Sequence, residues 1–194
     1  MKVIVFENNY SQASADSNPS WYVVADSAIS NAGKPFYVPD RFGEVAVSVA
    51  PAFKCCRLGK SVEPRFASRY FREVAPAVHF RLLDLKEELQ RKGVSFSPAV
   101  SFDRSVMTGD FIPLDPADKP LSLKLNINGE TVSLWEYKEM KQGLYEAVSG
   151  FSRLNTIKMG DVILPAPGTP FIIKEGDFIE VVGDGFKPLV IKVK

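Results

Sequence analysis

The sequence predicts a β-rich α+β domain, because most of its regular segments have the pattern of strands. Two pairs of short apolar segments are separated by turns that contain glycine, which is typical of β-hairpins. Two other segments, 82–92 and 140–151, repeat apolar residues at helical spacing. The 194 residues, 45% of them hydrophobic, are enough for one sizeable core and few for two, so one domain is the default.

The N-terminal part contains two predicted strands, Met1–Phe6 and Trp21–Val24, joined by a polar, serine-rich loop. Further on, Cys55 and Cys56 are adjacent in a segment with the pattern of a strand, where neighbouring side chains point to opposite faces. This spacing excludes a disulfide framework in practice and fits a reducing cytoplasm.

The stretch 57–84 predicts a turn, a short helix and a strand in succession. Pro64 suits the first helical turn, where its missing N–H is not needed, and Ser61 or Glu63 can cap that helix. Apolar side chains on one helical face then predict that the helix packs inward. They are Phe66, Ala67, Tyr70, Phe71 and Val74. A strand at 75–80 follows.

The second half of the chain alternates hairpins with helices. Segment 82–92 reads as an amphipathic helix that ends at Gly93. Asn128-Gly129 between two strand-like segments is the strongest short-range hairpin signal. A helix is predicted over 140–151, and segments 178–182 and 189–193 form the last hairpin. We expect Trp135 and Phe151 in the core, with an exposed role at an interface as the alternative.

Several function classes are excluded by composition. The formal charge is +1 and no block of lysine and arginine occurs, so nucleic acid and anionic membranes are not expected partners. No stretch approaches the roughly 18 apolar residues of a membrane span. Residues 1–30 lack the basic start and apolar centre of a signal peptide, and we expect a cytoplasmic protein.

Several short motifs together resemble one known family. They are Lys34-Pro35-Phe36 with Pro39, the run RLGK at 57–60 with FA.RY at 66–70 and Asp84, Phe102-Asp103, Asn128-Gly129, and Thr156 to Ile163. This pattern is similar to the fumarylacetoacetate hydrolase family, in its bacterial branch of acylpyruvate hydrolases and hydroxyhepta-diene-dioate isomerases. The resemblance extends from Asn9 to about Lys194. It implies a rolled mixed β-sheet domain with a few short helices at 34–194, an N-terminal β segment and loop at 1–33, and a homodimer.

The family's chemistry, as the resemblance implies it, is hydrolysis of a carbon–carbon bond in an acylpyruvate-like β-diketo acid, or a related isomerisation or decarboxylation. Mg²⁺ or Ca²⁺ held by three carboxylates grips the substrate, and a His-Glu pair activates water. Aligned without gaps, this chain has Ser48, Ala50 and His79 at the metal positions. Because none of these carries a formal negative charge, we expect no metal of the family kind.

The other catalytic positions are replaced as well. Ala13 and Asp16 stand where the family has its histidine and glutamate, and Val100 stands where it has a lysine. Sliding Glu44 into a metal position would require a four-residue insertion and would supply only one carboxylate. A methyl group cannot accept a proton, so these positions predict the loss of the family's general base.

His79 is the only histidine, which excludes any histidine pair. We favour a hydrogen-bonded interior role for it over a role as ligand or base. Arg81 lies two residues further on and, in a strand, on the same face, so the two side chains could hold a carboxylate ligand without metal. Tyr10 is the third candidate for ligand binding and Asp16, with His79, a weak candidate for catalysis, although loop packing is the plainer interpretation of Tyr10 and Asp16.

Three functions of different classes remain open. The first is a degenerate family member without the classical activity, acting as a metal-free binding protein or as a partner of an active paralogue. The second is an active hydrolase, isomerase or decarboxylase with a rebuilt site that recruits His79, Asp16, Glu44 or Asp103. The third is a structural dimer without a ligand. Metal analysis separates the first two.

Overall fold

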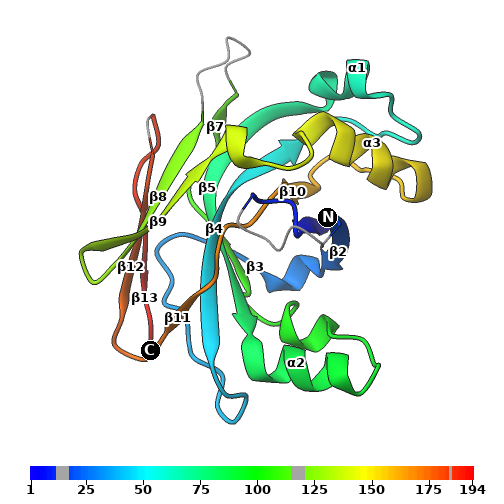
Figure 1. Cartoon of the computed structure of the whole chain (residues 1–194). Coiled ribbons are helices and arrows are strands. Elements are labelled where there is room, and N and C mark those ends of the chain that lie inside the picture. The colour runs from blue at the N-terminus through cyan, green and yellow to red at the C-terminus, as the bar shows by residue number, and fades with distance from the viewer. Residues whose placement is uncertain (12–17, 115–120, 184) are drawn as a thin grey trace.

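The computed structural model describes residues 1–11, 18–114, 121–183 and 185–194, which form two β-sheets with short helices (Figure 1). The larger sheet has nine strands in the order β2-β1-β10-β4-β5-β6-β3, with β11 also paired to β4 and β7 to β5. Its strands are β1 (Val3–Glu7), β2 (Ser20–Val24), β3 (Ile29–Asn31), β4 (Val45–Cys55), β5 (Phe71–Leu82), β6 (Val106–Thr108), β7 (Ile112–Pro113), β10 (Val162–Leu164) and β11 (Phe171–Ile173).

The smaller sheet has four antiparallel strands in the order β13-β12-β8-β9. They are β8 (Ser122–Ile127), β9 (Glu130–Glu136), β12 (Phe178–Val182) and β13 (Leu189–Lys192). The α-helices are α1 (Pro64–Ala67), α2 (Leu83–Arg91) and α3 (Leu144–Leu154). Single 3₁₀ turns lie at η1 (Asp26–Ala28), η2 (Ser68–Tyr70), η3 (Ser97–Ala99) and η4 (Tyr137–Glu139). The predicted β-rich α+β class and both hairpins are therefore confirmed.

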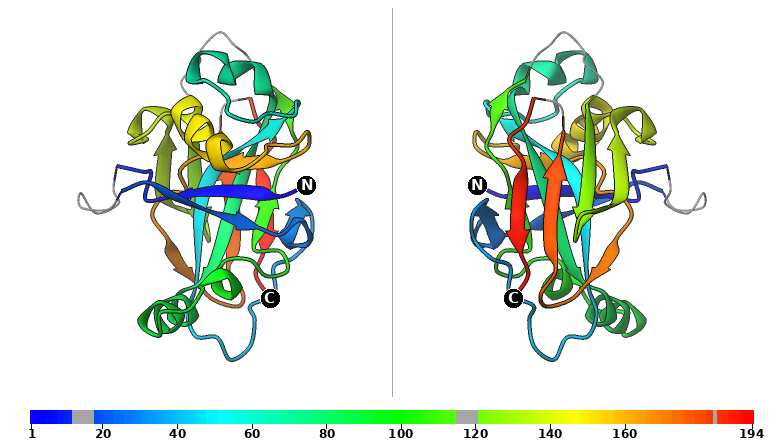
Figure 2. Two further views of the ribbon diagram at one scale, coloured as in Figure 1. Left: turned by 90° about the vertical axis from the view of Figure 1, so that its right-hand side faces the viewer. Right: turned by 90° about the vertical axis from the view of Figure 1, so that its left-hand side faces the viewer.

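The larger sheet is mixed and strongly curled. Its β1–β10 and β3–β6 pairs are parallel, whereas its other pairs are antiparallel. Figure 2 shows β1 and β2 crossing the direction of the long strands β4 and β5 at a steep angle. The strands of residues 1–33 thus belong to the same sheet as β4, β5, β6, β7, β10 and β11, and the proposed division at residue 33 stays a prediction.

The long strands β4 and β5 lie at the centre because both of their faces are buried. One face carries Val47, Val49 and Phe80, which pack with residues of the smaller sheet such as Leu123 and Leu125. The other face carries small residues such as alanine, which pack against β1 and β2. Burial on both faces explains why β4 reads as a nearly continuous apolar run rather than as an alternation.

The helix predicted after Pro64 is shorter than expected. Pro64 does open α1, but α1 has four residues, and the preceding Glu63 makes no side-chain capping bond. Phe71 and Val74, which we expected on the helical face, belong to β5 instead. Pairing with β4, in which Phe71 lies opposite Cys55, overrides the helical spacing of the apolar residues. The prediction for this segment was therefore wrong beyond Tyr70.

The later helices are confirmed with small shifts. Leu85 and Leu89 of α2 pack against the core as predicted, whereas Leu82 is the last residue of β5. The other predicted helix is α3, and it begins only at Leu144. Trp135 and Phe151 are fully buried, which confirms their core position and removes them as interface residues. No helix in the described part of the chain is long and apolar enough to cross a membrane.

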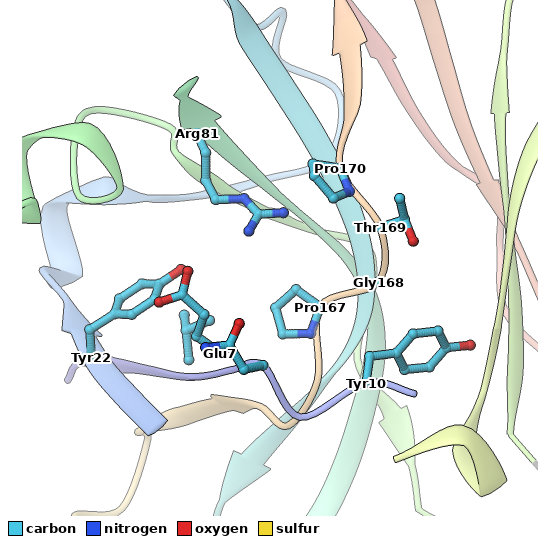
Figure 3. Close-up of a pocket in the computed structure, with 10 residues that line it drawn as sticks. Glu7, Tyr10, Tyr22, Arg81, Pro167, Gly168, Thr169 and Pro170 are labelled. Carbon is cyan, nitrogen blue, oxygen red and sulfur yellow. The ribbon is translucent and has the colours of Figure 1, made fainter. Parts of the chain in front are cut away.

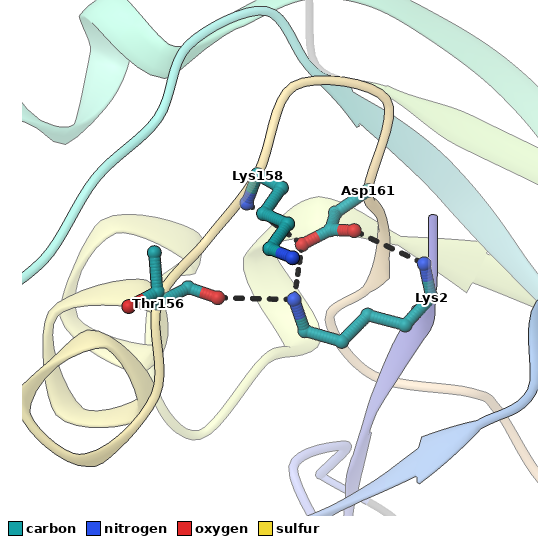
Figure 4. A network of polar contacts seen from close by, with 4 residues as sticks. All are labelled: Lys2, Thr156, Lys158 and Asp161. Carbon is teal, nitrogen blue, oxygen red and sulfur yellow. Dashed lines mark hydrogen bonds and ion pairs between the residues drawn. The ribbon is translucent and has the colours of Figure 1, made fainter.

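A buried carboxylate fixes β1 beside β10 (Figure 4). Asp161 accepts hydrogen bonds from the backbone N–H of Lys2 at 3.0 Å and of Lys158 at 2.8 Å. The ammonium of Lys2 forms an ion pair with the same carboxylate and donates to the carbonyl of Thr156 at 3.0 Å. Since β1 leads directly into the segment from Glu7 to Tyr10, this contact also positions one wall of the cavity described next.

Candidate ligand pocket

A cavity of about 270 Å³ opens where the ends of β1 and β5 meet β2 and the segment before β11 (Figure 3). It is lined by Val5, Glu7, Asn8, Tyr10, Tyr22, Arg81 and Pro167 to Pro170. Arg81 and Tyr10, two of the three residues predicted for ligand binding, therefore border the same space. The polar ends of Arg81, Tyr22 and Glu7 point toward one another across it (Figure 3).

The strand register sets the wall that carries Arg81. Ser48 lies opposite His79 between β4 and β5, and Ala46 lies opposite Arg81. Arg81 donates from Nη2 to the hydroxyl of Ser48. Its buried Nε–H has no hydrogen-bond partner among the described residues. The guanidinium is therefore held at one end and retains unused donor capacity beside the cavity.

His79 lies beneath the cavity wall and is fully buried. Its Nε2 is 3.0 Å from the carbonyl oxygen of Val100, and its Nδ1 is 3.3 Å from the hydroxyl of Tyr22. Desolvation, and next the positive charge of Arg81, lower the pKa of His79 to about 3. His79 is thus neutral near pH 7 with both ring nitrogens occupied, so it has no free nitrogen for a metal or for a substrate proton.

Glu7 is the acidic group of the cavity. It ends β1 on the same face as Val5 and forms an ion pair with Lys86 of α2. Both side chains are about 15% exposed. Opposite Val5 in the strand register stands Tyr22, whose pKa is raised by burial and by the charge of Glu7, although Arg81 opposes the shift. Tyr22 therefore stays protonated near neutral pH.

Tyr10 borders the cavity, but its side chain points away from Arg81 and Tyr22 (Figure 3) and its hydroxyl bonds to β9. The hydroxyl donates to the carbonyl of Leu134 at 3.2 Å and accepts from the N–H of Glu136 at 3.0 Å. The ring stacks on Trp135 with 6.0 Å between centroids. Neighbouring Asn9 bonds through its side chain to Gln142 and Pro165. The Asn-Tyr motif therefore holds the loop in place.

Three other candidates lie elsewhere. Asp16 falls outside the described residues. Glu44 is exposed just before β4, and Asp103 is exposed after η3; neither lines the cavity. Asp84 accepts a hydrogen bond from the N–H of Glu44 at 3.0 Å and so braces that turn. The active-site roles considered for Glu44 and Asp103 thus have no support from their positions.

Sequence reasoning missed Glu7, Tyr22 and Lys86. The sequence did contain a signal for Glu7, because Glu7 lies on the same strand face as Val3 and Val5, and this face is otherwise apolar. Tyr22 could be placed only once β2 was paired with β1. Lys86 looked like one of several solvated charges of α2, and only the docking of α2 brings it to Glu7.

The residues at the expected metal positions do not fit Mg²⁺ or Ca²⁺. These hard ions prefer carboxylate and other oxygen ligands. The hydroxyl of Ser48 is engaged by Arg81, Ala50 offers a methyl group, and His79 is fully hydrogen-bonded. The described residues contain no group of three or more His, Cys, Asp or Glu side chains able to hold a metal. A guanidinium beside these positions further disfavours a dication.

A second cavity of about 570 Å³ is larger but carries none of these features. Its border includes four exposed lysines, Lys34, Lys187, Lys192 and Lys194, and none of the residues predicted for the site. Arg81, Glu7 and Tyr22, polar side chains that face one another, line the Arg81 cavity instead. That cavity is therefore the candidate site.

Comparison with known proteins identifies the scaffold. The sequence model described as fumarylacetoacetate (FAA) hydrolase C-terminal matches residues 4–194. The mitochondrial oxaloacetate tautomerase of Bos taurus is 27% identical over 192 residues, covering 94% of this chain and 84% of that protein. Oxaloacetate tautomerase YcgM of Escherichia coli K12 is 24% identical over 198 residues, covering 95% and 89%.

Solved structures show the same fold. Fumarylpyruvate hydrolase from Pseudomonas aeruginosa, in complex with Mn²⁺ and pyruvate, superposes with a TM-score of 0.92 at 18% identity, covering 100% of this chain and 89% of that one. 2-Hydroxyhepta-2,4-diene-1,7-dioate isomerase from Mycobacterium marinum gives 0.86 at 21% identity, covering 99% and 73%. Both the fold class and the family resemblance are confirmed: the chain belongs to the fumarylacetoacetate hydrolase family.

Proposed function

We propose that this protein binds a small carboxylate without a metal and lacks the metal-dependent activity of its family. The observation that carries the proposal is the guanidinium of Arg81, which lies against Ser48 and beside His79 at the positions expected to hold acidic metal ligands. A fixed positive charge in this place attracts the negative charge of a carboxylate ligand, as a bound metal cation would.

The geometry of Arg81 favours binding of a carboxylate. A guanidinium presents five N–H donors in a planar fork that matches the two oxygens of a carboxylate. One terminal nitrogen is used by Ser48, and the buried Nε–H has no protein partner among the described residues. Because this Nε is fully buried, a ligand in the cavity meets the terminal nitrogens of the guanidinium, which face the cavity in Figure 3. A ligand carboxylate can accept charge-assisted hydrogen bonds from these terminal N–H groups.

The same residues disfavour the family's chemistry. Two curated relatives, from Bos taurus and Escherichia coli, are named oxaloacetate tautomerases, and tautomerisation requires a group that moves a proton at the substrate carbon. His79 is neutral, buried and hydrogen-bonded at both nitrogens, and Val100 has no titratable atom. The remaining acid of the cavity, Glu7, is engaged with Lys86.

Isothermal titration calorimetry with pyruvate and with dicarboxylic acids tests the binding. We expect heat from at least one of these acids with the wild type and a loss of roughly 100-fold or more in affinity with Arg81→Ala. Arg72→Ala is the matched control, because Arg72 lies on the same strand with an exposed side chain away from the cavity. Circular dichroism checks folding of each variant. Binding to Arg81→Ala as tight as to the wild type would refute the proposal, as would an absence of heat with every acid.

Metal analysis and activity assays test whether the protein lacks the metal-dependent activity of its family. After dialysis against Mg²⁺, Mn²⁺ or Ca²⁺, the protein should retain far less than one ion per chain. Tautomerisation of oxaloacetate and cleavage of acylpyruvates should stay at the buffer rate with each ion added. A stoichiometric ion, or turnover that Ser48 or His79 substitutions abolish, would support the rebuilt-enzyme alternative instead. The homodimer stays a prediction, for which light scattering is the direct test.

A further inference from the structure

Two acceptors face Arg81 across the cavity, and the first is the oxygen of Tyr22. The carbonyl of Val100 can only accept a hydrogen bond, so the Nε2 of His79 must carry the proton in that 3.0 Å contact. The other nitrogen, Nδ1, is then an acceptor, and the hydroxyl of Tyr22 donates to it at 3.3 Å. Because its proton is directed toward His79, the Tyr22 oxygen presents only lone pairs to a ligand. The Tyr22 ring is held edge-on against Phe96, 5.6 Å between centroids, which limits rotation away from this arrangement.

The second acceptor is the carboxylate of Glu7. Lys86 contacts its Oε1, and a carboxylate has lone pairs for about four hydrogen bonds on its two oxygens. Glu7 therefore keeps capacity to accept from a ligand while its charge is balanced. In Figure 3 its carboxylate and the Tyr22 hydroxyl lie on one side of the cavity, with the Arg81 guanidinium facing both.

This arrangement discriminates between classes of small acid. A ligand whose carboxylate lies on Arg81 places the substituent of its neighbouring carbon toward Tyr22 and Glu7. A 2-oxo acid has only acceptor lone pairs there, which would meet the lone pairs of both side chains. A 2-hydroxy acid has an O–H that donates to either of them.

Charge separates the two ligand classes that carry a donor. Arg81 and Lys86 against Glu7 leave one positive charge in excess among the ionised side chains of this cluster. A 2-hydroxy acid brings one negative charge and balances it. A 2-amino acid is a zwitterion, whose ammonium would add a third cation beside two and leave the excess uncompensated.

We infer that the pocket selects a small 2-hydroxy carboxylate, bound through its carboxylate to Arg81 and through its hydroxyl to Tyr22 and Glu7. The inference rests on the proposed function, since it names the ligand class of the same site. The ligand meant here is a saturated 2-hydroxy acid, whereas the 2-hydroxyl group of the acid for which the Mycobacterium marinum isomerase is named sits on a double bond. The selecting groups, Glu7 and Tyr22, act on the substituent of the neighbouring carbon and not on the carboxylate.

Calorimetry with lactate, pyruvate and alanine tests this selection, because the three acids share one carbon skeleton and differ in the substituent. Both enantiomers of lactate are titrated. The wild type should bind one enantiomer of lactate at least about tenfold more tightly than pyruvate or alanine, in line with one hydrogen bond to a charged acceptor. Equal affinity for lactate and pyruvate, or preference for alanine, would overturn the inference and leave carboxylate binding by Arg81 intact. No heat with any acid would overturn both proposals.

Two isosteric variants assign the selection to residues. Tyr22→Phe removes one acceptor and should lower the ratio of lactate to pyruvate affinity severalfold. Glu7→Gln replaces a pure acceptor by an amide that can also donate, and should raise pyruvate affinity while lowering that of lactate. The matched control is Glu73→Gln, which breaks a comparable ion pair with Lys54, at 2.9 Å, outside the cavity. If the wild type prefers lactate but neither variant changes the ratio, the assigned contacts are wrong.

Discussion

Replacing Asp161 by asparagine tests the buried contact that fixes β1 against β10. Three N–H donors converge on the carboxylate: the backbone and ammonium nitrogens of Lys2 and the backbone nitrogen of Lys158. Asparagine has one carbonyl oxygen and one NH₂ group, so its NH₂ must face at least one of these donors. Since Asp161 is fully buried, water cannot take the place of the lost oxygen.

The expected loss of stability in Asp161→Asn follows from the hydrogen bonds that the carboxylate accepts. A hydrogen bond to a charged group contributes roughly 1.5–3 kcal/mol, and a buried donor left unpaired costs about 1–3 kcal/mol. The ammonium of Lys2 reduces the total, because its side chain is 23% exposed and can be rehydrated. We therefore expect Asp161→Asn to lower the free energy of unfolding by about 3 kcal/mol.

Urea denaturation measures this loss as a shift of the midpoint at constant slope. Glu73→Gln provides the comparison, because Lys54 and Glu73 form an ion pair with 2.9 Å between Nζ and Oε2, but both side chains are about 40% exposed. Exposed pairs contribute about 0–1 kcal/mol. If Asp161→Asn were no more destabilising than Glu73→Gln, burial and convergence of donors would not be what stabilises this strand pair.

Three further predictions concern the buried histidine, a turn glycine and the loop that contains Asn9. Desolvation lowers the pKa of His79 to about 3 from its ordinary 6.5, so on acidification the unfolded chain takes up a proton before the folded chain does. As the pH falls from 6.5 to 3, His79 should therefore lower the free energy of unfolding by about 1.4 kcal/mol per pH unit. This contribution should be absent in His79→Gln when the unfolding curves of the two proteins are compared across pH. Gly43→Ala and Gly93→Ala both place a side chain on a backbone with positive φ, but only at Gly43 would the new methyl group clash with the carboxylate of Asp84. The melting temperature of Gly43→Ala should therefore fall further than that of Gly93→Ala. Equal shifts would argue against the steric explanation. Asn9→Ala removes three hydrogen bonds that tie the loop to Gln142 and Pro165 and should cost about 2 kcal/mol or more in urea, with loss below 0.5 kcal/mol contradicting the assigned role.

The fold was predictable because local signals agreed with the family pattern over nearly the whole chain. The Asn128-Gly129 turn forms the hairpin of β8 and β9, with both residues at positive φ. The exception is instructive: the apolar spacing through Phe71 and Val74 is helical in sequence, but these residues pair or pack as part of β5. A long strand buried on both faces has no alternation to distinguish it from a helix.

The site was only half predictable for a related reason. His79 and Arg81 are separated by one residue of a strand, so their shared face could be deduced from spacing alone. Glu7 and Tyr22 reach the cavity from two different strands, and Lys86 reaches Glu7 from α2, so the pairing of β1 with β2 and the docking of α2 are needed to bring them together. Long-range pairing of this kind leaves little trace in a single sequence.

Under the proposed function, Arg81 takes the place of a metal ion, so the site binds an acid without turning it over. In the family site implied by the resemblance, a dication neutralises the substrate carboxylate and also polarises the neighbouring oxygen as a Lewis acid. Arg81 can perform the first task through charge and hydrogen bonds, but it forms no coordinate bond and so polarises that oxygen far less. Moreover, the acceptors Tyr22 and Glu7 stabilise a hydroxyl on the neighbouring carbon, whereas an enolate oxygen developing there would be repelled by them. Under the proposed function, a pocket built this way would retain affinity for an acid and raise the barrier to its enolisation, so we expect that restoring metal ligands alone does not restore catalysis.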